Sequence, residues 1–72
     1  MNIPLLAGPM AVVDAIERYR LSHNGRNPTR KEFGDIFFGL GMERDVIDDY
    51  INIAIKADIV MHDKATDFLF KK

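Results

Sequence analysis

Hydrophobic positions recur every three or four residues along most of the chain, which is the period of an α-helix. The pattern occupies three segments and predicts helices over residues 9–22, 30–38 and 43–56. The apolar positions of these helices are Met10, Val12, Val13, Ile16 and Tyr19 in the first, Phe33, Ile36 and Phe37 in the second, and Val46, Ile47, Tyr50, Ile51, Ala54 and Ile55 in the third. We expect these positions to form the core.

Residues that start and stop helices lie at the ends of the three segments. Pro9 suits the first position of a helix, and Gly25 suits the left-handed conformation that ends one. Thr29 and Glu32 have the spacing of a capping box, in which each side chain accepts a hydrogen bond from the backbone amide of the other. Residues 39–41 (Gly-Leu-Gly) predict a tight turn before the third helix.

The hydrophobic period changes after residue 58. Two short β-prone runs separated by a polar loop predict a hairpin over residues 59–70. Alternation along a strand places Phe68 and Phe70 on one face, which we expect to close over the helices. Residues 1–8 form an apolar arm, and the sequence leaves open whether this arm adds an edge contact. The predicted fold is one α+β domain, mainly helical, with three helices and a C-terminal β-hairpin.

Several of these features resemble one known family in their order and spacing. They are residues 16–19 (Ile-Glu-Arg-Tyr), residues 24–25 (Asn-Gly), residues 27–33 (Asn-Pro-Thr-Arg-Lys-Glu-Phe), residues 40–41 (Leu-Gly) and residues 56–60 (Lys-Ala-Asp-Ile-Val). On these residues the chain is similar to the winged helix-turn-helix DNA-binding domain of LexA-type repressors. The resemblance implies that the third helix enters the major groove of duplex DNA and that the hairpin, the wing, lies near phosphates.

Charge changes this picture, because nucleic-acid binders usually carry an excess of basic residues. The chain has a net charge of −1 with an uneven layout. Residues 1–32 hold five basic and three acidic side chains, whereas residues 33–63 hold two basic and seven acidic ones. The exposed positions expected at the start of the third helix are Glu43, Arg44, Asp45, Asp48 and Asp49, followed by Asn52. Carboxylates there would be repelled by phosphates, so conventional reading of the groove is in doubt.

Two functions follow from these observations. The first is a small DNA-binding regulator of transcription, of a kind common in phages and mobile elements by analogy of fold. Its expected phosphate contacts are Arg26, Arg30, Lys31 and Lys64, and its expected base-reading residues are Arg44 and Asn52. The second is a non-enzymatic module that binds or inhibits a protein partner. Its expected contacts are Glu43, Asp45, Asp48 and Asp49. The resemblance slightly favours duplex DNA as the partner.

Each charged set also has a purely local explanation. Arg30 or Lys31 could pair with Asp35, and Arg44 could pair with Asp48 one helical turn away. A second ambiguity concerns apolar residues outside the main stripes, which either close the core or form a homodimer or partner patch. These residues are Phe38, Leu40, Met42, Leu5 and Leu6.

Candidate chemistry is sparse. The chain has no cysteine, and its two histidines lack the spacing of metal ligands. Ser22 is adjacent to His23, but neighbours in sequence do not make a nucleophile and its base. No phosphate-binding loop is present. We therefore expect no enzymatic activity, cofactor or metal. The chain has no apolar stretch of about 20 residues and no signal peptide, so we expect a soluble cytoplasmic protein without membrane contact.

Overall fold

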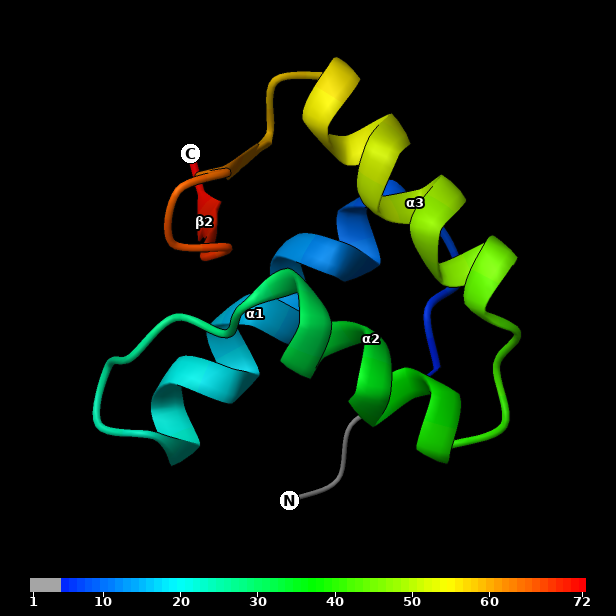
Figure 1. Cartoon of the computed structure of the whole chain (residues 1–72), viewed down its shortest axis with the longest axis horizontal. Coiled ribbons are helices and arrows are strands. Elements are labelled where there is room, and N and C mark those ends of the chain that lie inside the picture. Colours follow the sequence, from blue (N-terminus) through cyan, green and yellow to red (C-terminus); the bar gives the residue numbers. More distant parts are fainter. Residues whose placement is uncertain (1–4) are drawn as a thin grey trace.

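Three helices and an antiparallel hairpin make up the computed structural model, which describes residues 5–72. The elements are α1 (Pro9–Ser22), α2 (Arg30–Gly39), α3 (Arg44–Lys56), β1 (Val60–His62) and β2 (Leu69–Lys71), shown in Figure 1. The predicted α+β, mainly helical fold with a C-terminal hairpin is confirmed. The helix bounds agree with the sequence pattern to within one residue: α2 extends to Gly39, and Glu43 occupies the N-cap position just before α3.

Local interactions mark the start of α2 and the end of α1 as the sequence predicts. The Thr29 hydroxyl accepts from the Glu32 amide at 3.0 Å, and the Glu32 carboxylate accepts from the Thr29 amide at 3.0 Å. This capping box satisfies two amides that the first turn of a helix cannot satisfy itself. After α1, Asn24 and Gly25 both adopt left-handed backbone conformations, with φ of 55° and 83°. The chain therefore reverses within a few residues and enters α2.

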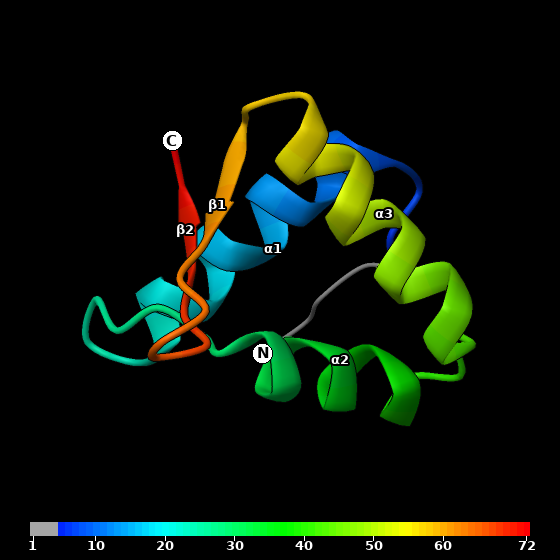
Figure 2. The ribbon, with the colours of Figure 1, turned by 45° about the horizontal axis from the view of Figure 1, so that its top comes forward.

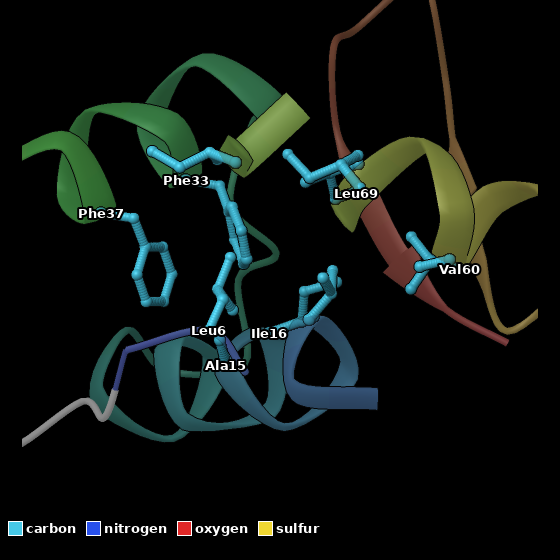
Figure 3. Close-up of a cluster of buried hydrophobic side chains, with 11 residues drawn as sticks. Leu6, Ala15, Ile16, Phe33, Phe37, Val60 and Leu69 are labelled. Carbon is cyan, nitrogen blue, oxygen red and sulfur yellow. The ribbon is translucent and has the colours of Figure 1, made fainter. Parts of the chain in front are cut away.

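The hydrophobic core lies where the three helices meet the hairpin. Figure 3 shows Phe33 and Phe37 extending from α2 toward Leu6 and Ile16, with the hairpin residue Leu69 nearby. The buried apolar cluster consists of Leu6, Val12, Ala15, Ile16, Phe33, Phe37, Ile47, Ile51, Ala54, Val60 and Leu69. Leu6 brings the arm into the core, whereas Leu5 is 54% exposed. The sequence left an edge contact of the arm open, and residues 1–4 of the arm lie outside the described residues. Met10 is 65% exposed, so its assignment to the core is wrong. Phe38 and Leu40 are also exposed and do not close the core.

The hairpin packs with one face on the helices. Its register pairs Val60 with Lys71, Met61 with Phe70 and His62 with Leu69. Two residues are buried on this inner face, Val60 and Leu69. Leu69 is 0% exposed.

The prediction that Phe68 and Phe70 close over the helices is wrong. They share a face, with ring centroids 6.2 Å apart, but that face is the outer one and both are half-buried. A shift of one residue reverses which face of a strand meets the core. The left-handed backbone of Asp67, with φ of 67°, turns the chain just before the strand and directs Leu69 inward.

The inward-facing stripe of α3 is narrower than predicted. Ile47, Ile51 and Ala54 are buried, but Val46 is 38% exposed, so its assignment to the core is wrong. Successive residues of a helix are rotated by about 100°, which carries Val46 past the edge of the contact with α1 and α2. Ile53, which is 48% exposed, lies on the same side of α3 as Val46. Two apolar side chains of α3 therefore remain partly exposed to solvent.

The hairpin is also attached to the start of α2. Thr29 and Phe68 form an isolated antiparallel bridge, and the Leu69 amide donates to the Pro28 carbonyl at 2.9 Å. The Arg30 amide donates to the Asp67 carbonyl at 2.8 Å. Figure 2 shows the hairpin loop beside the segment that enters α2. This arrangement brings the hairpin loop and the start of α2 into a single region of the surface.

Candidate interaction surface

The outer side of α3 carries a group of carboxylates that we call the acidic face. Its residues are Glu43, Asp45, Asp48 and Asp49, all of them exposed. The helix forms an outer edge of the molecule in Figure 1. Asp48 lies 3.6 Å from the guanidinium of Arg30. The other three carboxylates have no ion pair within residues 5–72. The exposure of all four carboxylates confirms the prediction that this side of the helix faces solvent.

Local electrostatics accounts for only part of the acidic face. Asp45 lies in the first turn of α3, where the helix dipole stabilises a negative charge. Asp49 lies one turn further along and directly follows Asp45 on the helix surface, so the two carboxylates repel each other by a few tenths of a kcal/mol. Lys56 lies about two turns beyond Asp49 and three turns beyond Asp45, and it forms no ion pair with a described residue. The middle of α3 therefore keeps an uncompensated negative charge.

Two of the residues predicted to bind DNA contact each other. The Arg30 guanidinium donates to the side-chain carbonyl of Asn52 at 2.9 Å and also lies near Asp48. The Arg30 side chain is only 23% exposed as a result. Arg30 is thereby held along one flank of α3 and offsets one carboxylate of the acidic face.

Two further predicted DNA contacts, Lys31 and Arg44, meet at one carboxylate. Asp35 accepts from Arg44 at 3.1 Å and from Lys31 at 3.3 Å. These hydrogen bonds, with Arg44 the stronger cause, lower the pKa of Asp35. The guanidinium of Arg44 also lies 4.3 Å above the centre of the Phe38 ring. The predicted pair of Arg44 with Asp48 is wrong, because Arg44 turns back toward α2 and pairs with Asp35. The predicted pair of Lys31 with Asp35 is confirmed.

Arg26 belongs to a network that supports the start of α2. Its guanidinium donates to the Glu32 carboxylate at 3.2 Å and to the buried hydroxyl of Tyr19, which in turn donates to Glu32 at 3.3 Å. The Arg26 hydrogen bond, followed by that from the Thr29 amide, lowers the pKa of Glu32 to about 2. Arg26 thus faces the capping box, which gives this predicted phosphate contact a structural role.

Asp67 is an important residue that sequence reasoning missed. Its carboxylate accepts from the Lys31 amide at 3.1 Å and lies 2.8 Å from Nε2 of His62. The His62 hydrogen bond is the largest cause of the lowered pKa of Asp67. The start of a helix attracts phosphate groups, but at α2 the chain's own carboxylate occupies that position. No signal in the sequence links Asp67 to Lys31, because 36 residues separate them.

Lys64 differs from the other predicted DNA contacts. It is exposed in the hairpin loop and forms no ion pair with any part of the chain that the structure describes. The six predicted contacts therefore do not form one free basic surface. Arg30 and Asn52 lie together, Lys31 and Arg44 share Asp35, Arg26 supports the capping box, and Lys64 extends alone.

None of the described helices is both long and apolar enough to cross a membrane. Within the described residues, no three His, Asp or Glu side chains are grouped so that they could hold a metal ion. Comparison of this chain with known protein families, curated proteins and solved structures found no match.

Proposed function

We propose that this chain is a non-enzymatic protein-interaction module of winged-helix type, and that the acidic face of α3 binds or inhibits a basic protein partner. The observation that carries the proposal is the asymmetry of charge pairing. Glu43, Asp45 and Asp49 are unpaired within residues 5–72, whereas Arg26, Arg30 and Arg44 each contact a carboxylate of the chain. The charge left for an external partner on α3 is negative.

The same asymmetry weighs against groove binding by α3. Exposed ion pairs contribute only about 0–1 kcal/mol each, so phosphates could compete for the paired arginines. The unpaired carboxylates have no such alternative. Duplex DNA carries roughly one negative charge per 1.7 Å of helix axis, and an aspartate in the groove is favourable only where it meets a cytosine amine. A partner rich in Lys and Arg matches the surface without this cost.

Reversing the charge of the acidic face tests the proposal. We expect the Asp45→Lys/Asp49→Lys variant to bind a lysine- and arginine-rich peptide at least about tenfold more weakly than the native chain at low salt, because two attractive contacts become repulsive. Fluorescence anisotropy of the labelled peptide measures this difference.

A matched control reverses two exposed carboxylates of α1, which is the same change in net charge. We expect Asp14→Lys/Glu17→Lys to weaken peptide binding much less, since these residues pair with Arg18 and Lys71 away from α3. Equal losses in the two variants would show that net charge alone governs binding, and the proposal would then be wrong.

A DNA-binding regulator is the second candidate function, and two observations favour it. Lys64 forms no ion pair with residues 5–72 and lies in the hairpin loop, where the wing of such a domain meets phosphates. Arg30 and Asn52 are held side by side between α2 and α3. Affinity would then come from phosphate contacts made by the hairpin and the start of α2.

For this second candidate, we expect Lys64→Glu to weaken binding to a short duplex because it replaces an attraction to phosphate with a repulsion. The expected loss is roughly tenfold at about 50 mM salt, and native binding should fall steeply as salt rises. Anisotropy of a labelled duplex measures both effects. Absence of duplex binding by the native chain at this salt concentration would remove DNA from consideration.

A further inference from the structure

Beside the acidic face, α3 carries exposed apolar side chains, and the charge of the acidic face does not account for their exposure. Val46 and Ile53 are 38% and 48% exposed, and they lie seven residues apart on α3. Seven residues are two turns of a helix, so the two side chains lie about 10.5 Å apart on one side. Asp49 lies between them on the same side, three residues after Val46. We call Val46, Asp49 and Ile53 the α3 stripe.

Packing among residues 5–72 leaves this stripe only partly covered. The buried residues of α3 are Ile47, Ile51 and Ala54, which face the core on the other side of the helix. Asn52 and Asp48 contact Arg30 on the flank nearest α2. The α3 stripe lies on the flank away from that contact, and its two apolar side chains remain partly exposed to solvent.

A second copy of this chain is a poor occupant of the stripe. In a symmetric dimer the same surface patch of both copies forms the interface. Two α3 helices paired around a two-fold axis at the stripe would place Asp49 of one copy near Asp49 of the other. Asp45 would add to this repulsion, and Lys56 is a single compensating charge at the far end of the exposed face. The charges therefore favour a different, positively charged partner.

We propose that the α3 stripe docks an amphipathic helix of a protein partner. Apolar side chains of that helix cover Val46 and Ile53, while its Lys or Arg side chains meet Asp45 and Asp49. Helices that bind in this way present apolar anchors at positions i, i+3 or i+4, and i+7, and this spacing matches the two turns between Val46 and Ile53. The inference rests on the proposed function and narrows its basic partner to a basic helix with one apolar side.

Selection from a library of random peptides, each roughly four to five helical turns long, tests this inference with the full chain as bait. We expect the enriched peptides to carry apolar residues at helical spacing, with Lys or Arg beside them. One enriched peptide is then labelled, and its binding to native chain and to variants is measured by anisotropy.

The variants separate the apolar contribution from the charge. We expect Val46→Ser and Ile53→Ser each to weaken binding about tenfold, as loss of a buried anchor does. The control Met61→Ser removes a similarly exposed apolar side chain on the hairpin and should leave binding within about twofold. Circular dichroism of each variant confirms that α3 is retained, which the exposed positions of these residues lead us to expect.

The possible outcomes distinguish the inference from the proposed function. Enriched peptides that are basic but lack apolar periodicity, and that bind Val46→Ser as well as native chain, would overturn the inference and leave a basic partner in place. Peptides that are acidic or uncharged, or a selection without enrichment, would overturn both. Enrichment of basic amphipathic sequences whose binding survives Met61→Ser but not Ile53→Ser supports both.

Discussion

Leu69→Ala is expected to lower the free energy of unfolding by about 2–5 kcal/mol, the range for truncation of a fully buried leucine. Leu69 is completely buried in the core cluster that also contains residues of the arm and of all three helices. The cost combines the lost burial of apolar surface with the cavity that remains. A domain of this size has little stability in reserve, so a loss at the upper end of the range would leave much of the population unfolded. Urea denaturation followed by circular dichroism measures the change.

Phe70 provides the matched control one position along the same strand. Its ring is larger than the leucine side chain, but it is half-buried on the outer face, where it contacts Phe68. We expect Phe70→Ala to cost clearly less than Leu69→Ala. The reverse order would place the outer face of the hairpin against the helices and contradict the observed register.

Glu32→Ala is expected to lower the free energy of unfolding by about 2 kcal/mol, because a buried hydroxyl and a backbone amide both lose their partner. Glu32 accepts hydrogen bonds from Tyr19, Arg26 and the Thr29 amide. Glu17→Ala removes an equally exposed carboxylate whose one ion pair among the described residues is with Lys71. That control should cost under about 1 kcal/mol. Equal losses in the two variants would show that the hydrogen bonds of Glu32 stabilise the fold no more than an exposed ion pair does.

The lowered pKa of Glu32 gives the same residue a signature in acid. Its ordinary pKa of 4.5 falls to about 2 in the folded chain, chiefly through Arg26. Ionised Glu32 therefore stabilises the fold above pH 4.5, and this contribution is lost as the pH falls from 4.5 through about 2. We expect the stability of Glu32→Gln to decline less over this interval than that of the native chain. Parallel declines would assign acid sensitivity to the other carboxylates.

What the sequence predicted correctly depended on neighbours along the chain. The capping box joins residues three positions apart, and its geometry follows once Thr29 begins a helix. The helical stripes have the same local origin. Lys31 and Asp35 are one turn apart on α2, so their ion pair was also accessible to sequence reasoning. The helical period of α3 alone was enough to predict that the acidic face is exposed to solvent.

What the sequence did not predict depended on single turns and on distant partners. The inner face of the hairpin is decided by the left-handed backbone at Asp67, a conformation that the residue type permits but does not require. Arg44 had two carboxylates within reach along the sequence, and the folded chain pairs it with Asp35 on α2 and not with Asp48 on its own helix. The exposure of Val46 likewise reflects where α3 meets its neighbours, which the apolar period alone does not determine.

The attachment of the hairpin loop to α2 makes the second half of the chain a closed loop. Arg30 and Lys31 at its beginning are bonded through their amides to Asp67 at its end, and α2, α3 and β1 all lie between these points. Opening the hairpin would expose the first amides of α2, and unwinding the first turn of α2 would release the hairpin. We therefore expect the two ends of this loop to open and close as one cooperative unit. The acidic face of α3 lies within this loop, so its position depends on the bonds between Asp67 and the start of α2.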